Sequence, residues 1–85
     1  MSYIIEAVQA DGYSGGFIGN VDGEVRFVHS MGTAFKFSET ANIENIVSSL
    51  KKLKELFPHN RVYKYEIRTY VPGYVGDLVR AVLVN

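Results

Sequence analysis

Two histidines and one glycine-rich segment are the residues whose types could support catalysis or phosphate binding. His29 and His59 are the side chains that titrate near neutral pH. Neither has a serine, a carboxylate or the other histidine at the spacing of a catalytic motif. Segment 12–19 is rich in glycine, but a phosphate-binding loop needs a helix directly after it and usually a lysine. Here a strand is expected to follow and the first lysine is Lys36. We therefore expect no enzyme activity, and glycines that serve a turn or a bulge.

Metal, redox and membrane chemistry have little support in the sequence. The chain has no cysteine, so it has no disulfide, no thiolate metal site and no cysteine nucleophile. Two isolated histidines and scattered carboxylates do not make a ligand set. Residues 1–6 lack a basic segment before an apolar run. The apolar run 81–84 is far shorter than the roughly 20 residues that span a bilayer. These features predict a cytoplasmic protein with no metal, no cofactor and no membrane contact.

The length and composition predict one folded domain, residues 1–85. Hydrophobic residues make up 47% of the 85-residue chain and aromatic residues 13%, which is enough apolar material to offset the entropy of ordering. The net charge is zero, although residues 1–45 carry a net −4 (two basic, six acidic) and residues 46–85 a net +4 (seven basic, three acidic). In a small compact domain these halves interleave, so simple charge balance explains the asymmetry.

The order of apolar patterns predicts an α+β fold. Alternating or apolar runs indicate strands at 3–9, 17–19, 24–29, 61–71 and 78–84, with a brief one at 33–37. Asp22 and Gly23 form the expected hairpin turn between two of them. Because apolar residues fall on both faces of 3–9, that strand is expected inside the sheet. Together these runs predict an antiparallel sheet of four to six strands.

One amphipathic helix, at about residues 39–57, is expected to pack on one face of this sheet. Apolar residues recur there at three- and four-residue steps, namely Ile43, Ile46, Val47, Leu50, Leu53 and Phe57. Ser38 or Thr40 is suited to cap its first backbone N–H groups. Pro58 ends it, because the residue before a proline resists helical geometry.

A nucleic-acid-binding surface is one of two functional hypotheses. In the strand 61–71, Lys64 and Arg68 lie on the face expected to be exposed to solvent, and alternation along the strand places Tyr70 on the same face. With Lys51, Lys52 and Lys54 of the helix they could neutralise phosphates while an aromatic ring stacks on a base. Glu66 interrupts this row, and a neutral chain lacks the strong attraction typical of nucleic-acid binders. We therefore take nucleic-acid binding as the alternative.

Protein–protein contact is the hypothesis that we prefer to nucleic-acid binding. Tyrosine is enriched at interfaces because it joins an apolar ring to a polar tip, and Tyr13 and Tyr74 lie in glycine-rich segments expected to be loops. The strand 78–84 has two apolar faces, so it either lies inside the sheet or is completed by another subunit. We expect a homodimer through the open sheet face or this strand. The predicted contact residues are Tyr13, Tyr74, Lys64, Arg68 and Tyr70.

Three short motifs resemble a known group of proteins. They are the opening Tyr3-Ile4-Ile5, the step Ala34-Phe35-Lys36-Phe37-Ser38 before the helix, and Tyr65-Glu66-Ile67 after it. In this order, with a glycine-rich hairpin between the first two, residues 3–71 resemble small uncharacterised accessory proteins of bacteriophages and prophages of Gram-positive bacteria. The resemblance implies a small binding protein that modulates a host or phage protein in the host cytoplasm. It implies no catalytic residues.

Overall fold

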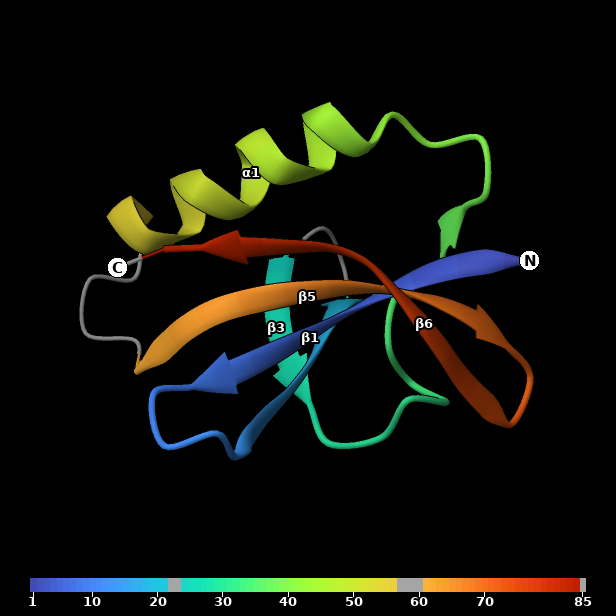
Figure 1. Cartoon of the computed structure of the whole chain (residues 1–85), viewed down its shortest axis with the longest axis horizontal. Helices are drawn as coiled ribbons and strands as arrows, with labels where there is room; N and C mark the ends of the chain where they lie inside the picture. The colour runs from blue at the N-terminus through green and yellow to red at the C-terminus, as the bar shows by residue number, and fades with distance from the viewer. Residues whose placement is uncertain (22–23, 57–60, 85) are drawn as a thin grey trace.

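Six strands and one helix follow one another along the described part of the chain. The computed structural model describes residues 1–21, 24–56 and 61–84. The elements are β1 (Ser2–Gln9), β2 (Ser14–Val21), β3 (Glu24–Val28), β4 (Phe37–Ser38), α1 (Ile43–Leu56), β5 (Val62–Val71) and β6 (Tyr74–Leu83). This is the predicted α+β fold, an antiparallel sheet with a helix across one face (Figure 1). Asp22, Gly23, Phe57, Pro58 and His59 lie outside the described residues.

The sheet order places β1 in the middle and β6 at one edge. The strands run β3-β2-β1-β5-β6, and β4 pairs with the start of β1. The prediction that the first strand is interior is confirmed, because β1 pairs with both β2 and β5. The prediction that the last segment is a strand is also confirmed. It starts earlier than expected, since Tyr74–Asp77 belongs to β6 and not to a loop.

A bulge accounts for the glycine-rich segment. Ala7 pairs with Gly16 and Val8 with Ser14, so the register between β1 and β2 shifts by one residue. Gly16 has a φ of 97°, a backbone conformation that side-chain-bearing residues rarely adopt. The glycines therefore serve a bulge, as expected, and no helix follows them directly.

The main core lies between α1 and the sheet. The predicted apolar stripe supplies four buried residues, Ile46, Val47, Leu50 and Leu53. They pack on side chains from the facing side of the sheet, including Ile5, Ile18, Tyr65, Ile67 and Val82. The helix begins later than predicted because Asn42 caps it: its Oδ1 accepts hydrogen bonds from the N–H groups of Glu44 (3.0 Å) and Asn45 (3.4 Å). Ser38 instead pairs with Ser2 in the sheet.

The opposite face of the sheet is covered only in part. The segment 29–36, between β3 and β4, passes under the sheet on the side away from α1 (Figure 1). Its Ala34 is buried against Ile4 and Tyr70, with Phe17, Val28 and Met31 packed around them. The prediction of a strand at 33–37 is wrong for most of its length, because only Phe37 and Ser38 pair in the sheet.

Candidate functional site

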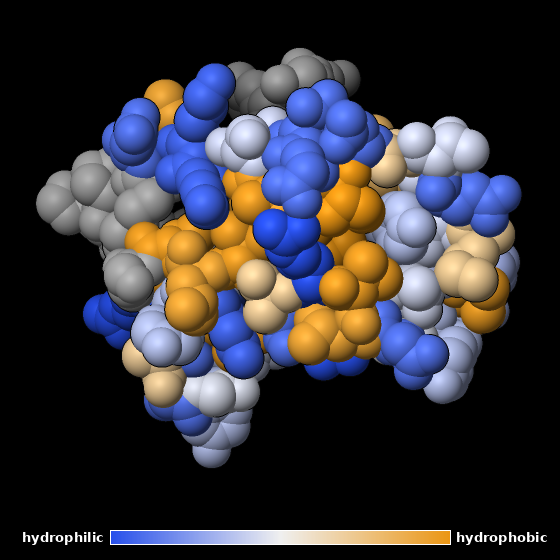
Figure 2. Space-filling model, turned by 45° about the horizontal axis from the view of Figure 1, so that its top comes forward, coloured by the Kyte–Doolittle hydropathy of each residue, from blue (hydrophilic) through white to orange (hydrophobic). Residues whose placement is uncertain are grey.

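The edge strand β6 exposes an unusual amount of apolar surface. Tyr74 is 63% exposed, Leu83 58%, Leu78 46% and Val79 41%. In Figure 2 hydrophobic side chains gather in the middle of the face that shows β6 and α1. A long, apolar edge strand is a ready template for pairing with another chain. Of the two arrangements predicted for the last strand, the structure excludes the interior one.

The backbone of β6 also has groups that face away from the sheet. The N–H of Val84 donates to the carbonyl of Tyr63 at 3.1 Å. Inward and outward groups alternate along an antiparallel strand, so the N–H groups of Val82 and Arg80 also face β5. Those of Ala81 and Leu83 then face outward, where no described strand pairs with β6.

The pairing of β6 with β5 is irregular before Arg80, because the register shifts between Ile67 and Arg68 and again between Arg68 and Tyr70. Ile67 pairs with Arg80, but Arg68 pairs with Leu78, so Val79 is an extra residue in β6. From Arg80 onward the ladder with β5 is regular, through the pairs of Ala81, Val82 and Leu83. The stretch that could extend the sheet without distortion is therefore Arg80–Leu83, with Val84 beyond it.

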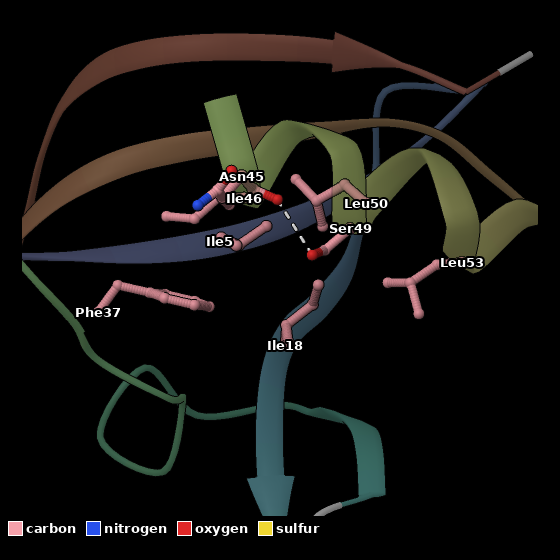
Figure 3. Close-up of a pocket in the computed structure, with 8 residues that line it drawn as sticks. All are labelled: Ile5, Ile18, Phe37, Asn45, Ile46, Ser49, Leu50 and Leu53. Carbon is pink, nitrogen blue, oxygen red and sulfur yellow. Dashed lines mark hydrogen bonds between the residues drawn. The ribbon is translucent and has the colours of Figure 1, made fainter. Parts of the chain in front are cut away.

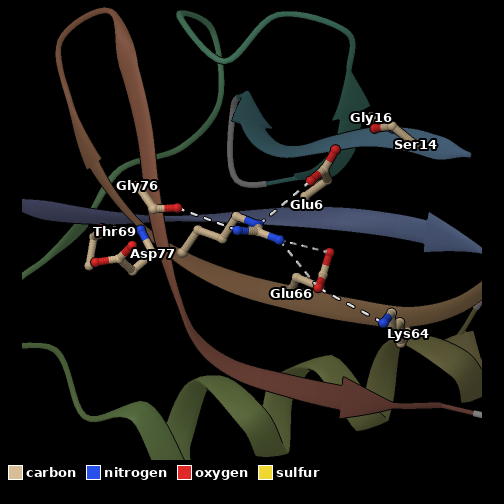
Figure 4. A network of polar contacts seen from close by, with 9 residues as sticks. Glu6, Ser14, Gly16, Lys64, Glu66, Thr69, Gly76 and Asp77 are labelled. Atoms are coloured by element: carbon tan, nitrogen blue, oxygen red, sulfur yellow. Dashed lines mark hydrogen bonds and ion pairs between the residues drawn. The ribbon is translucent and has the colours of Figure 1, made fainter. Parts of the chain in front are cut away.

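A neutral ion network occupies the open face of the sheet. Arg68 lies 3.4 Å from Glu66 and 3.9 Å from Glu6, and Lys64 lies 3.9 Å from Glu66 (Figure 4). Arg68 also donates to the carbonyl of Gly76 at 3.4 Å. Two cations thus face two carboxylates, and these four charges sum to zero.

The predicted nucleic-acid residues do not form one surface. Lys64 and Arg68 lie on the face opposite α1, paired with carboxylates, whereas Lys51 and Lys52 are exposed on α1 itself. The side-chain position of Lys54 is outside the described part of the structure. The sheet therefore separates the two groups of cations.

The predicted tyrosine surface is also divided. Tyr13 is 75% exposed in the turn after β1, and Tyr74 is exposed as the first residue of β6, directly after the turn that follows β5. These turns lie at opposite ends of the sheet, because Gln9 pairs with Val62 while Val71 pairs with Tyr74. Tyr70 has the predicted parity but is only 8% exposed, since segment 29–36 covers it. The Lys36 ammonium lies 5.3 Å from its ring centre.

One apolar hollow lies beside the helix. It has a volume of about 310 Å³ between α1 and the strands beneath it (Figure 3). Its lining is apolar except for Asn45 and Ser49, and the Ser49 hydroxyl donates to the Asn45 carbonyl at 3.0 Å. Among the described residues that line it there is no acidic, basic or histidine side chain, so these residues offer packing surface and not acid–base chemistry.

The other candidate residues for chemistry stand apart. His29 is exposed just after β3. Among the described residues no three histidine, aspartate or glutamate side chains gather as a metal site would require. In the same residues no helix has the length and apolar character needed to cross a membrane.

Comparisons with protein families, with curated proteins and with solved structures find no match for this chain. The resemblance to phage accessory proteins accordingly stays a prediction.

The two apolar faces of the strand 78–84 had led to the prediction that it is one of two possible dimer surfaces. Leu78, Val79, Ala81 and Leu83 were not among the predicted contact residues. The apolar residues on both faces of this strand are the signal that could have identified them.

Proposed function

We propose that this chain is a non-enzymatic protein-binding module whose binding site is the outer edge of β6. The observation that carries the proposal is the combination of outward backbone groups at Ala81 and Leu83 with exposed apolar side chains on the same strand. In binding by strand addition, main-chain hydrogen bonds supply affinity and alternate side chains supply specificity. Tyr74 extends the apolar surface at the start of the strand.

The surface chemistry favours a protein over a nucleic acid as partner. A phosphate backbone is held mainly by unpaired cations, but Lys64 and Arg68 lie beside Glu66 and Glu6. Apolar edge residues gain most from another apolar surface. The geometry of β6 supports binding by strand addition, and it does not select one partner. For the partner, the resemblance to phage accessory proteins predicts a host or phage protein met in the host cytoplasm.

A comparison of baits tests the proposal. Ala81→Pro removes an outward N–H while leaving the inward bonds of β6 in place, and proline is tolerated where a strand's N–H faces solvent. The wild-type chain, Ala81→Pro and a control, Phe27→Lys, would be tagged and used to capture proteins from nuclease-treated bacterial lysate. Phe27 is 36% exposed but lies on β3, at the opposite edge of the sheet.

We expect the wild type and Phe27→Lys to retain the same protein, identified by mass spectrometry, and Ala81→Pro to lose it. Equal capture by all three baits would overturn the assignment of the site to β6. Recovery of material only when nuclease is omitted would instead establish the nucleic-acid alternative. Circular dichroism of each bait shows that it is folded.

A further inference from the structure

We infer that the occupant of the β6 edge in the isolated protein is a second copy of this chain, paired antiparallel about Val82. The inference rests on the proposed function, because it uses the same edge, and it adds the identity of one partner and the register. Three observations on β6 carry it: the positions of the outward backbone groups, the side chains that would meet, and a hollow beside the strand.

The backbone fixes which registers are possible. Two outward residues, Ala81 and Leu83, must be hydrogen-bonded across the junction. With Val82 opposite Val82 of the second copy, each Ala81 lies opposite a Leu83 of the other copy. Ala81 and Leu83 of both copies are then all in hydrogen-bonded pairs across the junction. This register uses Arg80–Val84, the stretch beyond the extra residue Val79, so no bulge falls inside the new ladder.

The side chains favour the same register. On the open face, the small Ala81 lies opposite the large, 58% exposed Leu83 of the other copy. The Leu83 side chain can therefore occupy the space that the small Ala81 side chain leaves. Each Arg80 lies opposite Val84 of the other copy. Centring the pair on Arg80 would place two arginines directly opposite each other, and like charges in that position destabilise a sheet. Centring it on Ala81 would draw the bulged Val79 into the ladder.

The space beside β6 can receive the second copy. A hollow of about 230 Å³ lies between α1 and β6, lined by Val47, Lys51 and Arg80–Leu83. Across the junction, Val82 and Val84 of the second copy would lie on the same side of the sheet as α1. They would therefore lie next to this hollow.

The molar mass in solution tests the dimer. For the wild type and for the control Phe27→Lys, light scattering across micromolar to millimolar concentrations is expected to show a molar mass that rises from that of the monomer to twice that value. Leu83→Lys, which places a charge at the junction while leaving the buried core intact, is expected to give the monomer mass. A monomeric wild type at every concentration overturns the inference, as does a dimer that Leu83→Lys leaves unchanged.

Single cysteines test the register, because the chain has none of its own. Opposite residues that are not hydrogen-bonded to each other bring their Cβ atoms to within about 4.5–5.5 Å, close to what a disulfide needs. We expect Val82→Cys to form a covalent dimer under mild oxidation faster than Ala81→Cys or Leu83→Cys. Faster cross-linking at either neighbour overturns the Val82-centred register.

The two proposals can fail separately. A wild type that stays monomeric, but still captures a protein that Ala81→Pro loses, would overturn the dimer and leave the protein-binding function standing. A dimer sensitive to Leu83→Lys, with no other protein captured, would support the dimer and count against a separate partner at this edge.

Discussion

Gly16→Ala is expected to destabilise the fold far more than Gly12→Ala, although both glycines have a positive φ. Their φ angles are 97° and 89°. A left-handed backbone costs an alanine about 1–2 kcal/mol, and the smaller entropy of the unfolded chain returns about 0.4–1 kcal/mol. Gly12 has nothing within 4 Å of an added Cβ, so its substitution is expected to cost only the difference between these two terms, about 0–1.6 kcal/mol.

At Gly16 the added Cβ would lie 2.6 Å from the carbonyl oxygen of Val28. That oxygen belongs to the backbone of β3, where Val28 pairs with Phe17, so it cannot move aside without distorting the ladder. Overpacking of this kind costs about 1–3 kcal/mol. The expected difference between the two variants is therefore about 1–3 kcal/mol in the free energy of unfolding.

Urea unfolding followed by circular dichroism measures this difference. A chain of this length has a free energy of unfolding of about 4–13 kcal/mol, so the Gly16 variant remains measurable over most of that range. With a slope of about 1 kcal/mol per molar urea, its midpoint should fall about 1–3 M below that of Gly12→Ala. Gly73→Ala, also at positive φ with open space around it, should behave like Gly12→Ala. Equal midpoints for Gly12→Ala and Gly16→Ala would refute the placement of β2 against β3.

Two further predictions concern the helix cap and a buried tyrosine. Asn42→Ala should lower the free energy of unfolding by about 1 kcal/mol, because it removes the acceptor for two N–H groups at the start of α1; an unchanged urea midpoint would mean that another residue caps the helix. Burial raises the pKa of Tyr65 above its usual 10.0, so the folded state holds its proton more tightly than the unfolded chain. Stability should therefore be full below pH 10 and decline as the pH rises above it. Tyr65→Phe should reduce that decline, measured by urea unfolding at alkaline pH, and an identical pH profile in the two proteins would contradict the assignment.

The sequence predicted the elements whose periodicity is regular. In β5, Tyr65 and Ile67 are buried against α1 while Glu66 and Arg68 lie on the other face, as strict alternation requires. The helical stripe was equally clear because its apolar residues repeat at the helical period. The start of α1 was not, because Ser38, Thr40 and Asn42 are all residue types that can cap a helix. Ser38 does not cap the helix because it pairs with Ser2 of β1. Helical periodicity cannot predict such a contact between residues that are far apart in sequence.

The candidate site depended on contacts that periodicity does not carry. Tyr70 lies on the face that alternation assigns to solvent, but segment 29–36 folds over it. Glu6 reaches Arg68 only because β1 pairs with β5, and that pairing turns an apparently basic strand into part of a neutral network. The apolar character of β6 was visible in the sequence, whereas its position at the edge follows from strand order.

Amide hydrogen exchange along β6 tests the central claim most directly. In dilute protein the amides of Ala81 and Leu83 should exchange rapidly, while those of Arg80, Val82 and Val84, which face β5, should be protected. At high concentration, or with a bound protein, Ala81 and Leu83 should become protected as well. Protection of Ala81 and Leu83 already in the dilute monomer, or rapid exchange that no concentration or partner slows, would contradict the account of β6 as a protein-binding edge.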